Sequence, residues 1–440
     1  MSQSTDIDLR IRRLVAGSDG FFAQLDALTE WAAVADPALE QAVAGIVERV
    51  RKEGDSALVE FSRQFDQRTA SNIGELVVDR EQMNAALQAL PGELREALEL
   101  AAQRIRSFHE HQKQESWEYT DAQGVRMGQQ LSALQRVGIY VPGGQAAYPS
   151  SVLMNAIPAA VAGVEQIVMV SPAPADELNP VVLAAAALAG VDECYTVGGA
   201  QAIAALAYGT QTIARVDKIV GPGNRYVACA KRQVFGQVGL DMVAGPSEIL
   251  VVCDGQTNPD WIAMDMFSQA EHDADAQAIL VCPDDAYFDA VQASMERLLP
   301  DLERRDTIVE SLNNRGAFVL VADLDAAMTV VNRISPEHLE LSVADPDALL
   351  SQVRNAGAVF LGRSTPEAFG DYCAGPNHVL PTSTTARFAS PLGVYDFQKR
   401  SSIIQCSDAG AAALADVAEV LANSESLTAH AASARMRRQP

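Results

Sequence analysis

The sequence predicts an α/β protein: two tandem, doubly wound parallel sheets of incomplete Rossmann-like form, with helical extensions at the N- and C-termini. Three observations support this class. Short apolar runs alternate with helical patterns from Arg136 to about residue 390, glycine turns follow several of the runs, and the alternation continues past Gly245-Pro246-Ser247. Helices cover both faces of a parallel sheet, so its strands are apolar throughout, as these runs are.

A chain of 440 residues is long enough for two to four domains. We expect an N-terminal extension over residues 1–26 and a first α/β domain built from residues 27–136 and 246–390. A second α/β domain spans residues 137–245. A tail covers residues 391–440, where the alternation of strands and helices stops.

The N-terminal third is predicted to be helical. Asp36 and Pro37 begin a pattern of apolar residues at helical spacing, which Gly54 ends. A second long helical pattern ends with His109 and His111. We expect these two histidines to lie on a solvated helix end, without a catalytic role.

The middle of the chain alternates predicted strands and helices, beginning with a buried strand at Val137 to Val141. Further strands are expected at Gln166 to Val170, Cys194 to Val197, Asp217 to Val220, Glu248 to Val252, Gln277 to Val281, Ala317 to Val321 and Ala358 to Leu361. Ligands of such sheets bind at the carboxyl ends of the strands, where the glycine turns occur. Two helices are expected in the tail, over residues 408–422 and around Glu425 to His430.

The composition excludes several classes of protein. A net charge of −24 and the lack of an extended basic patch argue against nucleic-acid binding. The six cysteines show no paired spacing, so we expect buried small hydrophobic residues in a reducing compartment. The N-terminus lacks a basic segment followed by an apolar core, and no apolar run reaches membrane-spanning length. We therefore expect a cytoplasmic protein with no membrane partner.

Gln269 and His272 are the first candidates for chemistry. They fall three positions apart in the last turn of a helix that begins at Asn258 and Pro259, so their side chains share one face. An amide oxygen and an imidazole can bind a divalent metal, but a protein metal site usually has three or four ligands. Taken alone, the pair favours a structural role, such as an imidazole that caps carbonyls or faces solvent.

Three further stretches each combine a carboxylate with a histidine. They contain Glu337 with His338, Asp371 with His378, and Glu425 with His430. Together with the helix pair they supply enough groups for one metal site and an acid/base pair.

A dinucleotide site has only partial support from motifs. Gly221-Pro222-Gly223-Asn224-Arg225-Tyr226 has Tyr226 in the place of the third glycine, so the usual glycine fingerprint fails. The glycine pairs Gly143-Gly144 and Gly198-Gly199 are equally typical of tight turns in any α/β protein.

Seven motifs, in the same order along the chain, resemble those of the histidinol dehydrogenase family. They are Val141-Pro142-Gly143-Gly144, Val197-Gly198-Gly199-Ala200-Gln201-Ala202, Val216-Asp217-Lys218-Ile219-Val220-Gly221-Pro222-Gly223-Asn224, Ala244-Gly245-Pro246-Ser247-Glu248, Gln269-Ala270-Glu271-His272-Asp273, Ser335-Pro336-Glu337-His338-Leu339 and Asn377-His378-Val379-Leu380-Pro381-Thr382. The resemblance runs from about Ala27 to about Ala432, nearly the whole chain, so it is a specific signal.

The resemblance implies oxidation of L-histidinol to L-histidine through L-histidinaldehyde, the last step of histidine biosynthesis. Two NAD molecules are used per turnover, and one Zn²⁺ per subunit orients the substrate. Matched positions make Gln269, His272, Asp371 and His430 the zinc ligands. Glu337 and His338 match the acid/base pair, in which His338 accepts protons and Glu337 activates a water for the aldehyde step. The zinc ligands and this pair all contact the substrate in the family.

Other positions carry the remaining contacts that the resemblance implies. Ser247, His378 and Glu425 match substrate-contacting positions, and Tyr140, Gln201 and Asn224 match NAD-contacting ones. The segment 137–245 is then the NAD-binding domain, and the missing third glycine is a family trait. In the family, the positions of Glu425 and His430 reach the active site of the other subunit. The resemblance thus implies a homodimer with shared sites, to which the tail contributes.

Three alternatives remain open. A related zinc-dependent polyol dehydrogenase of the sulfopropanediol type is the closest, but such a substrate has no imidazole or amine for Glu425 and His378 to bind. A zinc hydrolase would use Glu337 to activate water and would need no nucleotide. A non-catalytic α/β binding protein predicts that removing zinc changes little.

Overall fold

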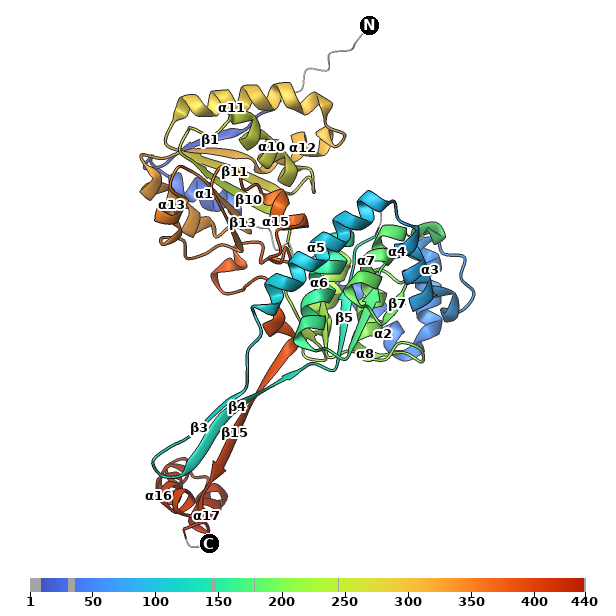
Figure 1. The fold of residues 1–440 in the computed structure, drawn as a ribbon, viewed down its shortest axis with the longest axis vertical. Coiled ribbons are helices and arrows are strands. Elements are labelled where there is room, and N and C mark those ends of the chain that lie inside the picture. Colours follow the sequence, from blue (N-terminus) through green and yellow to red (C-terminus); the bar gives the residue numbers. More distant parts are fainter. Residues whose placement is uncertain (1–8, 31–35, 144–147, 178, 244, 439–440) are drawn as a thin grey trace.

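Two six-stranded sheets, named here the A sheet and the B sheet, form the centres of two domains (Figure 1). The computed structural model describes residues 9–30, 36–143, 148–177, 179–243 and 245–438. Each sheet is wound outward in both directions from one strand, β10 in the A sheet and β5 in the B sheet. The next two strands pair successively on one side of it, and two later strands pair on the other. The predicted fold class, with two doubly wound sheets, is confirmed.

The A sheet is entirely parallel, in the order β1-β12-β11-β10-β13-β14. Its strands are β1 (Arg12–Val15), β10 (Glu248–Cys253), β11 (Gln277–Cys282), β12 (Ala317–Leu320), β13 (His338–Ser342) and β14 (Ala358–Leu361). Successive residues face opposite sides, so Ile249 and Val251 join one core while Leu250 and Val252 join another. The first core contains α10 (Pro259–Ala270), α11 (Asp285–Leu298) and α12 (Arg305–Arg315), and the second contains α1 (Phe21–Thr29), α13 (Leu324–Ile334) and α14 (Pro346–Leu350).

The B sheet has the order β2-β7-β6-β5-β8-β9 and is parallel except for β2. Its strands are β2 (Val77–Val78), β5 (Arg136–Tyr140), β6 (Gln166–Val170), β7 (Glu193–Tyr195), β8 (Lys218–Val220) and β9 (Gly239–Leu240). One face is covered by α4 (Arg80–Ala89), α5 (Gly92–Glu110), α6 (Pro149–Ala162) and α7 (Pro180–Ala189). The other is covered by α2 (Pro37–Glu53), α3 (Asp55–Asp66), α8 (Gly199–Tyr208) and α9 (Arg225–Val234).

The N-terminal segments do not belong to the domains in which we expected them. The helices of residues 37–110 belong to the cores of the B sheet, although we expected residues 27–136 to join residues 246–390. Residues 12–29 are not an extension: β1 pairs with β12, and α1 fills a core of the A sheet. An amphipathic pattern shows that a helix has a buried face, but it does not show which sheet covers that face.

Residues 373–383 form a loop that ties the two domains together. The Asn377 side chain donates to the carbonyl oxygen of Met154 in α6 at 2.6 Å, and Arg104 of α5 donates to the carbonyl oxygen of Cys373 at 2.7 Å. His109 lies beneath this loop, fully buried, with Nδ1 2.7 Å from the Ile105 carbonyl oxygen. The expectation of a solvated helix end is therefore wrong for His109, because packing against the loop buries it.

An arm extends from the B domain (Figure 1). It is an antiparallel sheet of β3 (Trp117–Thr120), β4 (Val125–Ala133) and β15 (Gln398–Cys406), with α16 (Asp408–Ser424) and α17 (Thr428–Arg435) at its tip. The two tail helices were predicted, but the three strands were not. The arm exposes large apolar side chains, at Trp117, Tyr119, Ile404, Leu414, Val417, Val420, Leu421 and Leu427.

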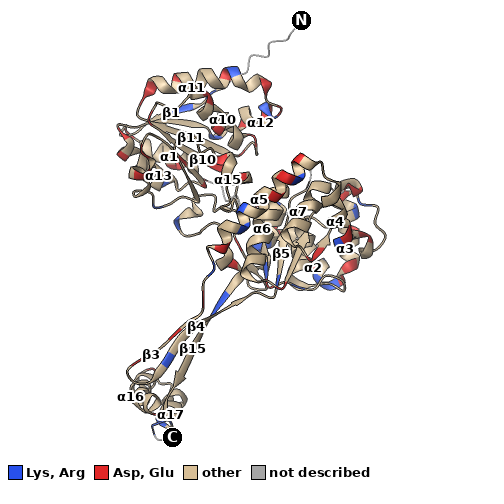
Figure 2. Cartoon of the chain, viewed as in Figure 1, with Lys and Arg blue, Asp and Glu red and all other residues tan. Residues whose placement is uncertain are grey.

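Basic and acidic residues are interspersed over both domains (Figure 2). Four cysteines are buried as expected, whereas Cys373 and Cys406 are exposed, since the loop and the arm that hold them lie outside the cores. Among the described residues, no helix is long and apolar enough to cross a membrane.

Candidate active site

Two neighbouring strands of the A sheet place the predicted acid/base pair. Ile249 of β10 lies opposite His338, the first residue of β13, and Glu337 stands immediately before it. The backbone N–H of Glu248 donates to Glu337 Oε2 at 2.9 Å, and His338 Nδ1 lies 3.0 Å from the Glu248 carbonyl oxygen. Both side chains are buried. The start of β10 therefore fixes the orientation of both groups.

The contact with Glu248 also fixes the tautomer of His338. A carbonyl oxygen can only accept, so Nδ1 must carry the hydrogen, and Nε2 of the neutral ring is left with its lone pair. Nε2 is buried and has no hydrogen-bond partner among the described residues; Asp371 Oδ1 lies 3.7 Å away. An imidazole nitrogen placed in this way is suited to accept a proton from a bound substrate.

The pair lies at the amino edge of the A sheet, which corrects the expectation that ligands of both sheets bind at the carboxyl ends. That expectation was based on the glycine turns that follow predicted strands. In the A sheet, however, the polar residues of the site directly precede strands. Ser247 directly precedes β10, and its carbonyl oxygen accepts from the N–H of Gln277, the first residue of β11, at 2.9 Å. This bond holds Ser247 at the same edge of the sheet as the pair.

The short helix α15 (Glu367–Tyr372) brings two carboxylates to His338. Glu367 and Asp371 are four positions apart and therefore share one face of the helix. Glu367 Oε1 lies 3.7 Å from Nδ1 of the imidazole, and Asp371 Oδ1 lies 3.7 Å from Nε2. One ligand atom each from His338, Glu367 and Asp371 lie within 4.8 Å of one another, which is close enough to hold a metal ion. Sequence reasoning found Asp371 but missed Glu367, whose only signal was its spacing from Asp371.

Gln269 and His272 approach the same place from α10. Gln269 is fully buried in the last turn, and its amide nitrogen can donate to Glu367 Oε1 at 2.8 Å and Oε2 at 3.0 Å. His272 lies just beyond the helix end, not inside the last turn as predicted, and is exposed. His378 is also close, since its Nδ1 lies 2.9 Å from the Asp371 carbonyl oxygen. The structure thus brings five of the predicted site residues together around Glu337 and His338: Ser247, Gln269, His272, Asp371 and His378.

Glu425 and His430 do not join this group within one chain. Both are exposed, Glu425 at the end of α16 and His430 in α17, and these helices lie at the tip of the arm (Figure 1). Their predicted contact with the active site of another subunit stays a prediction.

Burial and charge give the carboxyl groups different pKa values. Burial raises the pKa of Glu337 to about 7, and burial together with Glu337 raises the pKa of Glu248 to about 8. Burial also raises the pKa of Asp371, but its contact with His338 outweighs this and lowers the value. Burial lowers the pKa of His338, but Glu367 and the other nearby carboxylates raise it well above its ordinary value. Carboxyl groups with separated pKa values can serve different roles in one site.

The donor set fits a divalent cation. An amide oxygen, an imidazole and a carboxylate are ligands that Zn²⁺ accepts, and they come here from Gln269, His272 and Asp371. Several buried carboxylates surround one imidazole, so a cation would offset an excess of negative charge. The same cation would favour the neutral form of His338, which a proton acceptor requires.

The predicted NAD-contacting residues all lie at the carboxyl edge of the B sheet. Tyr140 ends β5, and its hydroxyl oxygen accepts from the Gly199 N–H at 3.1 Å. Gln201 is buried in the first turn of α8, and Asn224 caps α9. Burial raises the pKa of Tyr140 to about 12, so the phenol stays protonated. Gly144 of the predicted glycine turn falls outside the described residues.

A buried ion pair supports the turn that precedes Asn224. Lys231 Nζ donates to Asp241 Oδ1 at 2.5 Å and to the Gly221 carbonyl oxygen at 3.0 Å, while the Gly221 N–H donates to Asp241 Oδ2 at 2.8 Å. Gly221 has a φ of 106°, and a Cβ there would lie 2.2 Å from the Tyr140 carbonyl oxygen. Glycine is therefore required at this position, and the pair holds the turn in place.

We expect Lys231→Met to lower the free energy of unfolding by about 3–5 kcal/mol, because it leaves the buried Asp241 carboxylate without its partner. Urea denaturation followed by circular dichroism measures the change. Lys52→Met, which removes an exposed lysine paired with Glu48, is the control and should leave unfolding nearly unchanged. An equally small effect of Lys231→Met would show that the pair does not support the turn.

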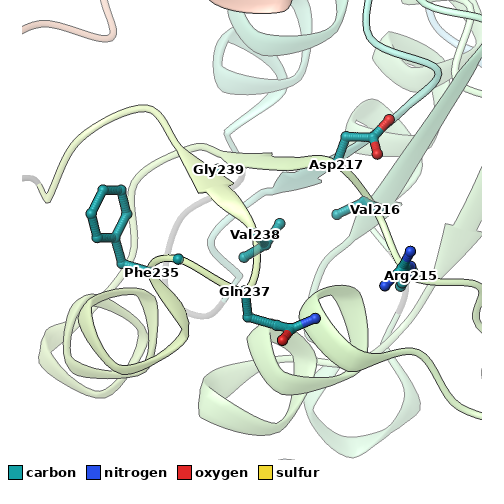
Figure 3. A pocket seen from close by; sticks show the side chains of 8 residues that line it. Arg215, Val216, Asp217, Phe235, Gln237, Val238 and Gly239 are labelled. Atoms are coloured by element: carbon teal, nitrogen blue, oxygen red, sulfur yellow. The ribbon is translucent and has the colours of Figure 1, made fainter. Parts of the chain in front are cut away.

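A separate pocket lies at the amino end of β8, the opposite edge of the B sheet from Asn224 (Figure 3). Its lining residues are Arg215, Val216, Asp217, Phe235, Gly236, Gln237, Val238 and Gly239. Asp217 Oδ2 already accepts from the N–H groups of Gln135 and Arg136 at 3.1 Å each. This carboxylate is used by the fold, and the pocket is separate from the candidate active site.

Comparisons with known proteins agree over nearly the whole chain. The family model described as histidinol dehydrogenase matches residues 31–438. A histidinol dehydrogenase of Pseudomonas putida is 62% identical over 431 residues, which is 98% of each chain, and one of Pseudomonas aeruginosa is 62% identical over 427 residues, 97% of each. The crystal structure of a histidinol dehydrogenase from Elizabethkingia anophelis matches with a TM-score of 0.92 and 32% identity over 98% of each chain. An acetylating aldehyde dehydrogenase from Geobacillus thermoglucosidasius shares the fold alone, with a TM-score of 0.50 and 12% identity over 85% of this chain and 98% of that one.

Proposed function

Because the chain belongs to the histidinol dehydrogenase family, we propose that it oxidises L-histidinol to L-histidine through L-histidinaldehyde, with NAD as oxidant and one Zn²⁺ in the site. It is an oxidoreductase that acts on an alcohol and an aldehyde, and its family catalyses the last step of histidine biosynthesis. The observation that carries the proposal is the arrangement of Glu337, His338 and Asp371 around one point at the amino edge of the A sheet.

His338 is the proposed proton acceptor in both oxidations. Its Nδ1–H is held by the Glu248 carbonyl oxygen, so the free Nε2 takes the proton of the substrate hydroxyl. After this proton has been released to solvent, the same nitrogen takes a second proton when the hydrated aldehyde is oxidised. NAD supplies the oxidising power in each step by accepting a hydride.

Glu337 is the proposed base for the water that attacks the aldehyde. Its carboxylate is buried beside the imidazole, and a pKa of about 7 lets it take a proton from water and release it again near neutral pH. Two neighbouring bases, with Glu337 Oε2 and His338 Nδ1 3.7 Å apart, can therefore serve two different steps.

Gln269, His272 and Asp371 would hold Zn²⁺, together with His430 of a second copy. When bound there, the metal would supply a fixed point for the imidazole and the amine of histidinol and would so orient the reacting carbon. Ser247 and His378, which lie beside the same group, are proposed substrate contacts. Tyr140, Gln201 and Asn224 are proposed NAD contacts at the carboxyl edge of the B sheet.

The arm supports the proposal of a homodimer with shared sites. Exposed apolar residues on α16, including Val417, Val420 and Leu421, need a partner surface, since monomeric proteins rarely leave such patches uncovered. We propose that a second copy covers them, and that its Glu425 and His430 then enter this chain's site. A polyol dehydrogenase on the same scaffold remains the second candidate function, but it would leave Glu425 and His378 without an imidazole or amine to bind.

The test of this function is the number of NADH molecules formed per histidinol consumed. We expect two, and we expect activity to disappear after treatment with a chelator and to return with added Zn²⁺. Absorbance at the NADH band measures the NADH formed, and an amino-acid assay measures the histidinol consumed and the histidine formed. One NADH per substrate would restrict the enzyme to alcohol oxidation, and turnover of sulfopropanediol but not histidinol would favour the second candidate.

A further inference from the structure

Glu367 is a buried carboxylate that none of the sequence motifs singled out. Its side chain is only 2% exposed, and its backbone N–H donates to Glu340 Oε1 at 2.7 Å. This bond fixes the first turn of α15, which carries the predicted zinc ligand Asp371 one turn later. A carboxylate buried this deeply needs a partner that donates hydrogen bonds.

The partner is the amide of Gln269. With its nitrogen turned toward Glu367, the amide donates at 2.8 Å to Oε1 and at 3.0 Å to Oε2, and the same nitrogen lies 3.2 Å from Nδ1 of His338. In the opposite orientation the amide oxygen would face only acceptors and the nitrogen only donors, so the orientation with the nitrogen toward Glu367 is the one that satisfies both ends of the amide. The amide oxygen then points away from Glu367, and oxygen is the atom through which a glutamine binds a metal.

Glu367 and Asp371 lie against opposite nitrogens of the His338 ring, at Nδ1 and Nε2 respectively. Nδ1 is already engaged by the Glu248 carbonyl oxygen, whereas Nε2 has no hydrogen-bond partner among the described residues. Glu367 therefore stands on the closed side of the imidazole and Asp371 on the reactive side. This placement favours a supporting role for Glu367 over direct contact with a metal or substrate.

We propose that Glu367 is a positioning residue, whose carboxylate holds the amide nitrogen of Gln269 and thereby directs the amide oxygen to the metal. The inference rests on the proposed zinc site and goes beyond its ligand set. Without Glu367 the amide loses the partner that distinguishes its two ends, so a fraction of molecules would present nitrogen to the metal.

The experiment titrates Zn²⁺ alone onto chelator-treated full-length protein by calorimetry. For Glu367→Gln we expect affinity about 10–100-fold weaker than wild type, with kcat largely recovered at saturating zinc. Glu340→Gln is the matched control: it also replaces a buried carboxylate, but its amide oxygen can still accept from the Glu367 N–H, so zinc affinity should stay within about twofold of wild type. Glu367→Asp keeps the charge and withdraws the carboxylate by one carbon, which should give a smaller loss and serves if Glu367→Gln does not fold.

Absorption spectra of the Co²⁺-loaded proteins separate positioning from ligation. We expect Glu367→Gln to keep the wild-type band positions, because the ligand atoms are unchanged once cobalt is bound. Shifted bands would make Glu367 itself a ligand and overturn the inference, as would equal zinc affinity of Glu367→Gln and wild type. Failure of the wild-type protein to bind zinc would remove the metal from the proposed function, and this inference with it.

Discussion

A heterodimer that pairs His272→Asn in one chain with His430→Asn in the other is expected to show about half of wild-type activity, although each variant alone is inactive. If the arm of each copy completes the site of the other, one of the two sites in this heterodimer holds both mutations and the other holds none. Co-expression with two different tags and sequential purification gives the heterodimer, and NADH formation from histidinol measures its activity.

The matched control places both mutations in one chain and pairs it with a wild-type chain. Shared sites then leave each site with one mutation, so this heterodimer should be inactive. Sites built within one chain reverse both results: the double variant with wild type would keep half of the activity, and the two single variants together would have none. The two heterodimers contain the same residues in the same number, so no difference in stability can explain opposite outcomes.

Glu337→Gln is expected to stop the reaction halfway. The amide cannot take a proton from water, so oxidation of the aldehyde should slow by about 10²–10⁴-fold, while oxidation of the alcohol continues through His338. Histidinol and histidinaldehyde, supplied as separate substrates, measure the two steps. Equal loss of both steps would remove the proposed role of Glu337 in water activation.

The pH dependence of the aldehyde step gives a second check on Glu337. Its pKa of about 7 means that the carboxylate form, which is the base, is lost as the pH falls below 7. The wild-type rate should rise with pH and level off above 7, and the residual rate of Glu337→Gln should lack this step. The free energy of unfolding changes with pH in the opposite direction to the rate. Because the pKa of Glu337 in the folded protein lies above the ordinary value of 4.5, its contribution to the free energy of unfolding is complete below pH 4.5 and is lost as the pH rises through 7.

Local signals predicted the strands and helices well where one segment decides its own structure. Asp36, with Pro37, begins α2 as expected, because its side chain accepts from the N–H groups of Ala38 and Leu39. The apolar runs of β6 and β10 coincide with the expected strands. Strand β13 was not predicted, because His338 and Glu340 interrupt its apolar run.

Long-range pairing could not be predicted from local patterns. The exposed strands β4 and β15 have no apolar face on the core, and their pairing joins residues more than two hundred positions apart. Glu367 was missed for a similar reason, because its proposed role depends on a contact with Gln269, which lies on another helix. Burial of His109 also depends on a distant loop, at Asn377.

The sheet of the arm cannot be completed until β15, near the C-terminal end of the chain, has been synthesised. β4 pairs with β15, which lies more than two hundred residues later in the chain. At roughly 5–20 residues per second, the ribosome synthesises β15 tens of seconds after β4. Until then the edge of the β3–β4 hairpin formed by β4 has unpaired backbone groups, which can pair with strands of other chains. If the arm makes the proposed contact with a second copy, a chain can make this contact only after β15 has been synthesised. A fragment that stops before this strand would then not disturb full-length assemblies through the arm.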